Sequence, residues 1–361
     1  MQQTEKEDLR RASESLISWF SDNCRDLPWR SHPSIYGTWL CEVIMQQTRI
    51  DQGIGYWHRF MAAFPTVSAL ADASESEVLK LWQGLGYYSR ARNLHRAAQF
   101  VARDLNGTFP SSAEEWRKLP GVGPYTAAAV ASMRFNEPAA AVDGNVNRVV
   151  ARYIGLDEPV DRPTGKKAIQ SAAEALLDRK RPGLHNEAMM ELGALICSPK
   201  NPDCLKCPLQ SGCASAGQKA AIEQRPFKQG KTKPKEVTIL FHVITDGLNV
   251  VICQRPTDGI WGGLWEFPSD WIDGIQSDTQ WDSPAAGLRW NRSWMASKPH
   301  ILSHRKLFGQ FGFWNTAGPS PSWPKHWLWV TWAEAESKAW PRMTERHWSE
   351  VKKAACEGRK V

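Results

Sequence analysis

The chain has 361 residues and carries 45 lysines and arginines against 38 aspartates and glutamates, which gives a formal net charge of +7. This length exceeds that of most single domains and predicts one large domain or two ordinary ones, and the basic balance favours a polyanionic partner. The first residues lack the apolar core of a secretory leader and no later segment is apolar for long enough to cross a bilayer, so we expect an intracellular protein without membrane contacts.

Helices are predicted to follow one another over residues 9–214. Apolar residues recur there at spacings of three and four, as at Leu16 and Phe20. Capping boxes at Ser74-x-x-Glu77 and Ser112-x-x-Glu115 mark two helix starts. No alternating run long enough for a strand interrupts this region, so the first part of the chain is predicted to be all-α.

The stretch TWLCEVIMQQTRI, residues 38–50, is predicted to form one helix. Winding it places Thr38, Glu42, Gln46 and Arg49 on a narrow polar stripe between apolar neighbours. One interpretation is a stripe that faces solvent. The other is the wall of a cleft, where partial desolvation raises the pKa of Glu42 and keeps a proton available near neutrality.

The stretch LPGVGPYTAAAV, residues 119–130, is predicted to form a tight turn between two helices. Gly121 and Gly123 permit backbone angles that are closed to other residues, and Pro124 suits the first turn of a helix. The outward-pointing N–H groups of such a turn bind phosphate without reading sequence. The alternative is a simple connection between two helices of a bundle.

Four of the eight cysteines lie within one short loop, which favours a metal centre in a reducing compartment over disulfides. Successive members are separated by six, two and five residues, and the run contains a single Cys-x-x-Cys knuckle. This compact spacing suits a four-iron cubane held by four thiolates, and zinc is the alternative. The four predicted ligands are Cys197, Cys204, Cys207 and Cys213.

A domain boundary is predicted in the basic stretch RPFKQGKTKPK, residues 225–235, which has two prolines, one glycine and no acidic residue. We therefore expect a helical domain over residues 1–221, a linker over 222–236 and a smaller second domain over 237–361.

The second domain is predicted to be α+β. Alternating apolar residues from Val237 to Val243, the turn signal Asp246-Gly247 and the apolar run 250–253 together predict a β-hairpin. The stretch LFGQFGFW, residues 307–314, is a further strand candidate. Thirteen of the nineteen tryptophans follow the linker, and we interpret them as packing residues in preference to a stacking platform for single-stranded nucleic acid.

A helix-hairpin-helix followed by the cysteine loop resembles the endonuclease III superfamily of base-excision DNA glycosylases, and within it the adenine DNA glycosylases of the MutY type. The resemblance is strong over about the first 215 residues and weaker beyond them, where WGGLWEFP and LSH carry it. The stronger motifs are LPWR (27–30), CEVIMQQTRI (41–50), LWQGLGYYSRARNL (81–94), LPGVGPYTAAAV (119–130), AVDGNVNRV (141–149) and NEAMMELGALIC (186–197).

The resemblance implies hydrolysis of the N-glycosidic bond of adenine mispaired with 8-oxoguanine or guanine in double-stranded DNA, by a monomer that carries one 4Fe-4S cluster. A bacterial member is expected in the cytoplasm with the nucleoid. Glu42 is the implied acid that protonates the flipped adenine, and Asp143 the implied carboxylate that stabilises the sugar cation. Asp143 also fits the N-cap of a helix from about Gly144, and the two roles are compatible.

Tyr125 occupies the position at which bifunctional relatives carry a lysine that forms a Schiff base with the sugar. Tyrosine cannot form that imine, so the resemblance implies a monofunctional enzyme that leaves an abasic site, with Tyr125 and Asn145 positioning the sugar. Gln47 is the implied wedge and Tyr88 the implied intercalating residue that prop the duplex open. Arg30 and Glu187 are the implied residues of the adenine pocket.

The family's second domain resembles a Nudix fold and recognises 8-oxoguanine. No acidic Nudix catalytic box is visible here, so pyrophosphatase activity is not expected. The lesion-reading motif of the family is Phe-Ser-His, and this chain has Leu302, Ser303 and His304. Ser303 and His304 can hydrogen-bond the lesion, but Leu302 lacks an aromatic face for stacking, which weakens the expected lesion discrimination.

Two other functions remain open at this point. A thymine or uracil mismatch glycosylase on the same scaffold can also carry tyrosine in the hairpin, although such enzymes generally resemble only the first domain. A non-catalytic DNA-binding protein can use the iron-sulfur loop structurally or as a redox sensor. Glu42 and Asp143 argue against this last function only weakly, because each also has an ordinary structural role.

Overall fold

The structure is a computed structural model that describes residues 3–230, 233–276 and 280–357. The described chain divides into two compact units. Unit 1 runs to Asp72 and resumes over Asn93–Gly230, and unit 2 comprises Ala73–Arg92 and the described residues after Gly230. In the part of the chain that is described, no helix is both long and apolar enough to span a membrane.

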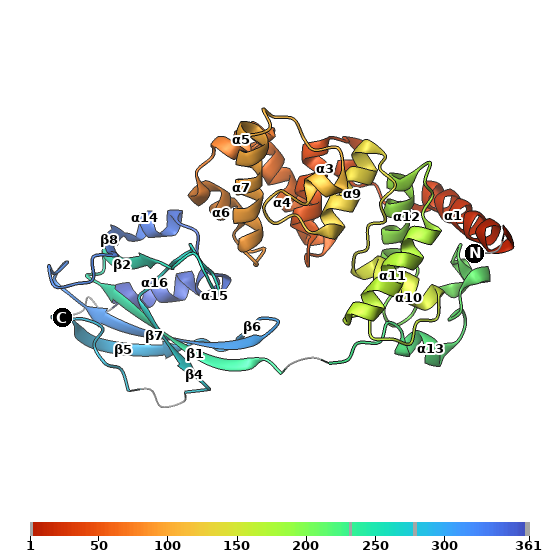
Figure 1. The fold of residues 1–361 in the computed structure, drawn as a ribbon. Helices are drawn as coiled ribbons and strands as arrows, with labels where there is room; N and C mark the ends of the chain where they lie inside the picture. The colour runs from red at the N-terminus through yellow and green to blue at the C-terminus, as the bar shows by residue number, and fades with distance from the viewer. Residues whose placement is uncertain (1–2, 231–232, 277–279, 358–361) are drawn as a thin grey trace. The chain divides into compact units, whose positions relative to one another are not determined.

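Unit 1 is helical throughout, which confirms the prediction for the first part of the chain (Figure 1). Its longer helices are α1 (Gln3–Asn23), α3 (Ile35–Met45), α4 (Ile50–Ala63), the larger part of α7 (Ser89–Arg103), α9 (Pro124–Phe135), α10 (Gly144–Tyr153), α11 (Pro163–Leu176) and α12 (Pro182–Leu195). Its shorter elements are α2 (Pro28–Ser31), α5 (Val67–Asp72), α8 (Ala113–Trp116), η1 (Cys204–Lys206), η2 (Gln210–Gly212) and α13 (Lys219–Gln224).

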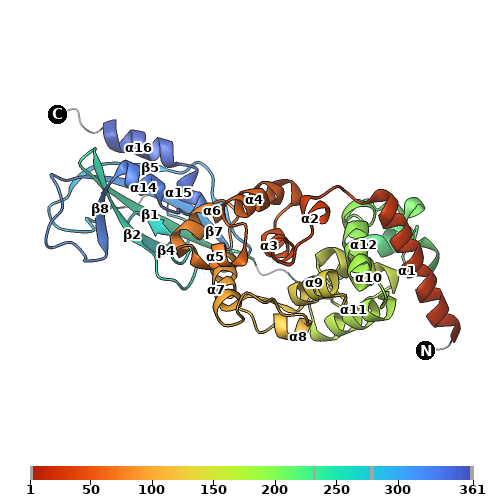
Figure 2. The ribbon, with the colours of Figure 1, turned by 90° about the horizontal axis from the view of Figure 1, so that it is seen from above.

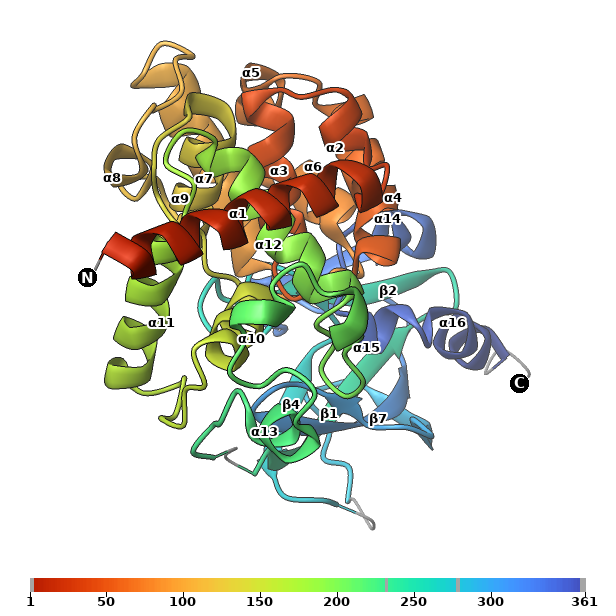
Figure 3. The same cartoon turned by 90° about the vertical axis from the view of Figure 1, so that its right-hand side faces the viewer.

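Two groups of helices meet along α9 and α12 in unit 1. Helix α3 packs against α4 and α9, and α12 packs against α9 and α10 (Figure 2). Helix α1 crosses α12 on its outer side, as Figure 3 shows, and also contacts α11. The N-terminal ends of α9 and α10 and the body of α3 are thereby brought to one region of the unit.

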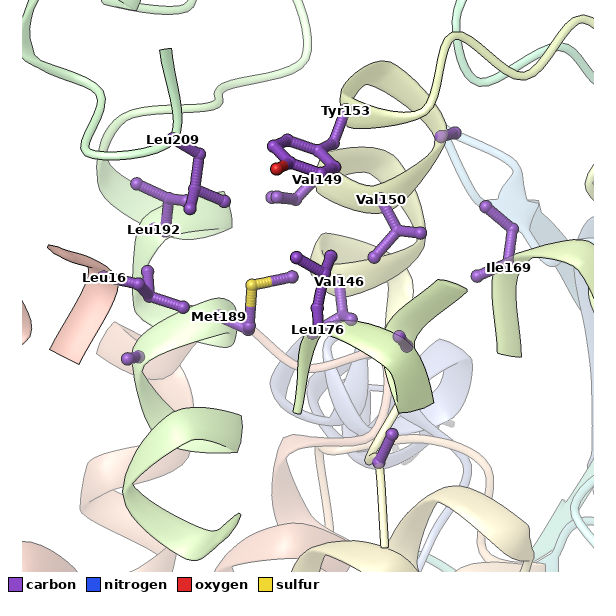
Figure 4. Close-up of a cluster of buried hydrophobic side chains, with 14 of the residues drawn as sticks. Leu16, Val146, Val149, Val150, Tyr153, Ile169, Leu176, Met189, Leu192 and Leu209 are labelled. Atoms are coloured by element: carbon purple, nitrogen blue, oxygen red, sulfur yellow. The ribbon is translucent and has the colours of Figure 1, made fainter. Parts of the chain in front are cut away.

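The apolar face of α10 anchors one buried core of unit 1 (Figure 4). Val146, Val149 and Val150 recur at helical spacing and pack with Leu16 of α1 and Leu192 of α12. Three of the clustered cysteines, Cys197, Cys207 and Cys213, are partly buried against the same core. The cysteine loop is therefore packed on the helix that carries Asp143 at its N-terminal end.

The predicted helix starts are present. Ser74 and Glu77 form a capping box at α6 (Glu75–Trp82), and Ser112 and Glu115 form one at α8. Asp143 is the N-cap of α10, as the sequence predicted. In each case a side-chain oxygen accepts a hydrogen bond from a free backbone N–H of the first turn, which fixes where the helix begins.

The connection between the units is shorter than the linker assigned from the sequence. Helix α13 continues to Gln224, past the expected end of the helical domain. Beyond it, the N–H of Val160 donates to the carbonyl oxygen of Phe227 at 2.9 Å, and the N–H of Gln229 donates to Asp161 at 3.2 Å. Composition suggested a solvated segment here, but these backbone groups are paired with unit 1.

Unit 2 contains α6, the first residues of α7 and a sheet of eight strands with three C-terminal helices. The central path is β3-β2-β1-β7-β5, with β4 on β1, β6 on β7 and β8 on β2. Strands β1 and β7 are parallel and the remaining pairs are antiparallel. The strands are β1 (Lys235–Thr245), β2 (Asn249–Gln254), β3 (Trp265–Glu266), β4 (Ser269–Asp273), β5 (Arg289–Met295), β6 (His300–Ile301), β7 (Arg305–Asn315) and β8 (Trp327–Thr331), and the helices are α14 (Trp332–Ser337), α15 (Arg342–Glu345) and α16 (Trp348–Glu357).

This arrangement confirms the α+β class, the hairpin of β1 and β2, and the strand over residues 307–314. Most tryptophans of unit 2 pack against other aromatic rings, as predicted. Trp340 and Trp348 pack on Phe267 at ring-centroid distances of 4.9 and 6.0 Å, and Trp290 packs edge-on against Trp314 at 4.9 Å.

Candidate active site

A cleft of about 910 Å³ opens in unit 1 where α3, α9, α10 and α12 meet. It brings together seven of the residues predicted from the sequence, which come from segments up to 157 positions apart. They are Arg30, Glu42, Gln47, Tyr125, Asp143, Asn145 and Glu187.

Glu42 is only 9% exposed, so the polar stripe of α3 lines the cleft and does not face solvent. The hydroxyl of Tyr125 donates to its Oε2 at 2.5 Å. Burial raises the pKa of Glu42 to about 7, the hydrogen bond from Tyr125 opposes this rise, and the nearby Asp143 charge adds to it. A carboxyl group in this position carries a proton for a large fraction of the time at neutral pH.

Asp143 is held by the start of its own helix. Its Oδ1 accepts from the backbone N–H of Val146 at 2.7 Å, and its Oδ2 accepts from Nδ2 of Asn145 at 3.1 Å. Burial raises the pKa of Asp143, while these hydrogen bonds and the Arg148 charge oppose the rise. Two donors that favour the ionised form distinguish this carboxylate from Glu42, which accepts one hydroxyl.

Tyr125, the second residue of α9, is a neutral hydrogen-bond donor. Burial, together with the nearby carboxyl groups of Glu42 and Asp143, raises the pKa of the phenol well above its ordinary value. Its hydroxyl lies 3.4 Å from Sδ of Met190 as well as 2.5 Å from Glu42. The ring therefore fixes the Glu42 carboxyl against α9.

Arg30 and Glu187 form one wall of the cleft. Nε of Arg30 donates to Oε1 of Glu187 at 3.0 Å, and the guanidinium lies over the ring of Phe20 at 4.9 Å. The two side chains are 18% and 21% exposed. Oε1 of Glu187 is thus engaged, and both groups keep access to the cleft.

The helix predicted over residues 38–50 is wrong in its second half. Helix α3 ends at Met45, and Gln47 takes a left-handed backbone conformation with φ of 56°. Gln46 is the C-cap, and its Nε2 donates to Oγ1 of Thr126 at 3.1 Å. Because the chain turns here, Gln47 is exposed beyond the helix end, while Arg49 becomes the N-cap of α4.

The ring of Tyr88 does not fit the intercalating role expected for it. It is 4% exposed, and its hydroxyl donates to the carbonyl oxygen of Trp340 within unit 2 at 3.3 Å. The neighbouring Tyr87 is 50% exposed and has a left-handed φ of 47°. Insertion of Tyr88 between bases would require unpacking its ring, whereas Tyr87 is already presented to solvent.

The two hairpin glycines differ in backbone conformation and in the space around them. Gly121 has φ of +73°, and a Cβ added there would lie 2.4 Å from Cβ of Asn93. Gly123 is the N-cap of α9 with an ordinary φ of −87°, and an added Cβ would meet nothing within 4 Å. Gly121 is therefore required by the turn itself, and Gly123 leaves open space at a helix N-terminus.

The four loop cysteines line one small cavity of about 30 Å³. The buried guanidinium of Arg152 ties the loop to α10 through the carbonyl oxygens of Ser198 and Pro199 at 2.7 and 2.8 Å, and one of its N–H groups lies 3.5 Å from Sγ of Cys197. Within the described residues, no three His, Cys, Asp or Glu side chains are arranged to hold a single metal ion. Four thiols around one cavity match the donor set of a four-iron cluster, in which each iron is bound by one thiolate.

Ser303 and His304 form the exposed two-residue turn between β6 and β7 in unit 2. The N–H of Leu302 donates to the carbonyl oxygen of Arg305 at 2.8 Å and closes the turn. Oγ of Ser303 and Nδ1 of His304 are 3.2 Å apart. Both polar side chains are therefore available to an external partner, and Leu302 is partly buried beside them.

Sequence reasoning missed Arg25, Arg134 and Glu191, which also line the cleft. Nε of Arg134 donates to Oγ1 of Thr38 at 2.5 Å, and Nε of Arg25 donates to Glu191 at 2.7 Å. Glu191 lies four residues after Glu187 on α12, so helical spacing was a signal that both carboxylates share a face. No comparable signal pointed to either arginine.

Comparison with known proteins agrees with the geometry in both units. The model of the HhH-GPD superfamily of base excision DNA repair proteins matches residues 40–179, and a NUDIX domain model matches residues 239–350. The adenine DNA glycosylase of Mus musculus is 33% identical over 91% of this chain and 75% of that protein. The adenine DNA glycosylase of Rattus norvegicus is 32% identical over 98% of this chain and 81% of that protein.

Two of the solved structures that resemble this chain each cover 58% of it. A thermostable thymine-DNA glycosylase has a TM-score of 0.53 and 28% identity, over 58% of this chain and 96% of that one. A non-covalent endonuclease III–DNA complex has a TM-score of 0.50 and 24% identity over the same shares, which establishes the fold alone.

Proposed function

Because the chain belongs to the adenine DNA glycosylase family of base excision repair proteins, we propose that it hydrolyses the N-glycosidic bond of adenine mispaired with 8-oxoguanine or guanine in double-stranded DNA. One observation carries the proposal: the carboxyl groups of Glu42 and Asp143 line one cleft and have different hydrogen-bond partners. Such a pair suits acid-assisted departure of a base from a sugar that becomes positively charged.

Glu42 is the proposed general acid. Adenine leaves poorly as an anion, so bond cleavage requires a proton on the departing base. A pKa of about 7 makes the protonated carboxyl available at neutral pH. The proton passes from Glu42 to a ring nitrogen as the bond from the base to C1′ breaks; water then gives its hydroxyl to C1′ and its proton back to Glu42.

Asp143 is the proposed stabiliser of the sugar cation. Its carboxylate is fixed by Val146 and Asn145 and carries negative charge toward the cleft that holds Glu42. Tyr125 and Asn145 position the sugar, and the phenol of Tyr125 offers no amine for attack on C1′. The product is therefore an intact strand with an abasic site.

Arg30 and Glu187 are the proposed adenine-pocket residues. Oε2 of Glu187 can accept from the exocyclic amino group of adenine, because Arg30 engages only Oε1. A guanidinium has five N–H donors, and three in Arg30 have protein partners among the described residues. An acceptor beside a donor matches the amino group and the adjacent ring nitrogen of adenine.

DNA is held and opened by residues outside the pocket. The hairpin amides around Gly121 and Gly123 contact phosphate. The adenine must leave the duplex at a cost of a few kcal/mol, and Gln47 at the end of α3 fills the gap as a wedge. We assign the intercalating role to Tyr87 in place of Tyr88 because Tyr87 is the exposed ring.

One 4Fe-4S cluster is proposed on Cys197, Cys204, Cys207 and Cys213, supported by the cavity that these residues share. When bound, the cluster would cross-link the loop to Cys197, just beyond the end of α12. Iron and zinc analysis of protein purified without added metal tests this assignment. About four irons per chain supports the cluster, and one zinc per chain supports the alternative.

Ser303 and His304 are proposed to read the lesion opposite the adenine, because both side chains lie on an exposed turn. The proposed partner is therefore double-stranded DNA that carries an A:8-oxoguanine or A:G mispair.

Duplexes that carry A:8-oxoguanine, A:G, T:G and U:G test the activity. Incubation with purified protein should release adenine from the first two, and strand breaks should appear only after alkali. Glu42→Gln should abolish release and keep affinity for the duplex. Release by this variant at the rate of the natural protein would remove Glu42 from its role, and no release from any duplex by the natural protein would favour a DNA-binding protein without activity.

A thymine mismatch glycosylase is the second candidate, because a thymine-DNA glycosylase resembles unit 1 at 28% identity. That likeness covers 58% of this chain, whereas the mouse adenine DNA glycosylase covers 91%. Release from T:G alone in the same assay would decide for this candidate.

A further inference from the structure

A buried ion network extends the cleft wall of Arg30 and Glu187 to Arg25 and Glu191, and these four residues are called the wall below. Glu191 of α12 has a side chain that is 2% exposed. Its Oε1 accepts from the backbone N–H and Nε of Arg25 at 2.9 and 2.7 Å. Its Oε2 accepts from Nη2 of Arg25 at 2.9 Å and from Nη2 of Arg30 at 3.2 Å. Each carboxylate oxygen thus has two donors, which is the full complement that such a buried charge requires.

Glu191 is ionised throughout the neutral range. Burial alone would raise the pKa of this carboxyl, but the hydrogen bonds from Arg25 and Arg30 and the charge of Arg30 outweigh burial and lower the pKa to about 2. The network therefore carries a permanent negative charge at this point of α12.

Arg30 is held on several sides by this network. Its Nη1 donates to the carbonyl oxygen of Arg25 at 3.0 Å, its Nη2 to Glu191, and its Nε to Glu187 at 3.0 Å. The ring of Phe20 lies against the guanidinium at 4.9 Å. These contacts fix both the plane and the rotation of the guanidinium. Two of its five N–H groups form no hydrogen bond with the described residues, and the side chain lines the cleft.

The formal charges of Arg25, Arg30, Glu187 and Glu191 cancel. The charged and titratable groups around Glu42 come from several elements: Cys41 from α3 itself, Tyr125 and Arg134 from α9, Asp143 from the start of α10, Glu187 from α12 and Arg30 from α2. The positive charge of Arg30 favours an ionised Glu42, and the negative charge of Glu187 disfavours it. Removal of the charge of Arg25 or of Glu191 leaves the wall with a net charge, and that charge changes the pKa of Glu42.

We propose that Glu191 is a positioning residue for base excision, which fixes Arg30 in the pocket wall and, together with Arg25, keeps that wall electrically neutral beside the acid Glu42. The inference rests on the proposed function, because it concerns the same pocket. Glu191 does not touch the base; it acts through Arg30. Its charge is what allows a guanidinium to stand in the pocket without drawing the proton from Glu42.

Two substitutions of opposite sign test the inference. Single-turnover adenine release is measured from pH 5 to pH 9. The pH at which the rate has fallen to half of its maximum on the alkaline side, called the midpoint, is compared between each variant and the natural protein. Glu191→Gln leaves the wall with a positive charge, which favours ionised Glu42, so the midpoint should fall by about half to one unit. Arg25→Gln leaves it negative, so the midpoint should rise by about the same amount. Loss of packing alone would slow release equally at every pH and leave both midpoints in place.

Asp178→Asn is the matched control. Asp178 accepts from the backbone N–H, Nε and Nη2 of Arg181 at 3.1, 3.0 and 2.8 Å, the same three donors that Arg25 offers to Glu191, and it does not line the cleft. This variant should keep the natural midpoint. Glu191→Asp retains the charge and should also keep the midpoint, even where the rate falls. Where Glu191→Gln does not fold, the rise of the midpoint in Arg25→Gln carries the test.

The possible results separate the two proposals. If the natural protein releases no adenine from any duplex, the proposed function fails. If it releases adenine and the midpoints of Glu191→Gln and Arg25→Gln stay where they are or move in the same direction, only the inference about the network is overturned. Opposite shifts with an unmoved Asp178→Asn support it.

Discussion

The pKa of Glu42 is the result of two opposing effects, burial of the carboxyl group and a hydrogen bond from Tyr125. Burial raises the pKa of this carboxyl to about 7, and the hydrogen bond from Tyr125 lowers it. A general acid works only while protonated, so adenine release should be highest below this pKa and fall about tenfold for each pH unit above it. Single-turnover rates over a pH series measure the midpoint. A rate that rises across this range would show that Glu42 is not the acid.

Replacement of Tyr125 by phenylalanine tests whether the hydrogen bond from Tyr125 lowers the pKa of Glu42. The variant keeps the ring and removes the donor that stabilises the ionised form of Glu42. The pKa of Glu42 should therefore rise, and release should persist to a pH about one unit higher than in the natural protein. The same pH series is the measurement, and a midpoint that falls would contradict the expected effect.

Asp143→Asn separates two roles of one side chain. Asparagine is as good an N-cap as aspartate, so α10 should keep its start and the free energy of unfolding should change by less than about 0.5 kcal/mol. The negative charge beside the sugar is lost, so single-turnover release should fall by about a hundredfold or more. Urea denaturation and single-turnover assays of the same preparation give both values. A stable variant with natural turnover would restrict Asp143 to capping.

Adjacent residues mark the limit of sequence reasoning at this scale. Tyr87 and Tyr88 have the same side chain, and only the packed structure shows that one is 50% exposed and the other 4%. The left-handed backbone at Tyr87 turns the two rings to different environments. The place of Glu42 on a polar stripe of an apolar helix and of Asp143 before a helix start, in contrast, could be predicted because both are local features, whereas their proposed roles came from the resemblance to a family.

The helix-hairpin-helix turn gives a matched pair of substitutions at the scale of an element. Gly121→Ala places a Cβ 2.4 Å from Asn93 and forces a φ of +73° on alanine, so the free energy of unfolding should fall by about 1–3 kcal/mol. Gly123→Ala meets no neighbour and keeps an ordinary φ, so its stability should be close to natural. Its methyl group lies where phosphate approaches the amides, so affinity for DNA should fall about tenfold.

Denaturation curves and DNA titrations of the two variants provide the measurements. The DNA affinity of Gly121→Ala, measured at a temperature where this variant remains folded, is the control for the effect of a disturbed turn on DNA binding. Equal stability of both variants would show that the turn does not depend on the conformation of Gly121. Natural affinity in Gly123→Ala would place the phosphate elsewhere.

Helix ends and long-range pairs were the features that sequence did not predict in full. The polar period of residues 38–50 continues past Met45, but the chain turns at Gln47, because α4 starts anew at Ile50 and tertiary contacts decide the turn. Arg25 and Glu191 are 166 positions apart, and no local pattern pairs them. The capping boxes and the N-cap Asp143 were predicted correctly because donor and acceptor lie within three residues.

The change of apolar period along the chain predicted the two architectures correctly, from helical spacing in the first part to alternation after the linker. The grouping of Ala73–Arg92 with unit 2 was not predicted, because this segment has the same helical period as its neighbours. Its assignment comes from contacts such as that of Tyr88 with Trp340, which join residues 252 positions apart. Period and composition identify elements, and only packing assigns each element to a unit.

In the proposed function, unit 1 excises adenine and unit 2 recognises the opposite lesion. Substitution of Leu302 in unit 2 tests this division. The turn that follows it presents Ser303 and His304, but leucine has no aromatic face on which a base can stack. Stacking is worth about 1–3 kcal/mol for each base, so Leu302→Phe should raise the preference for A:8-oxoguanine over A:G by about tenfold. The rate on A:G should stay natural, since the cleft of unit 1 is unchanged. The ratio of single-turnover rates, with enzyme in excess of DNA but below saturation, gives the preference. Leu302→Met, which is large, flexible and not aromatic, is the control: an equal gain in both variants would show that size and not stacking limits lesion reading.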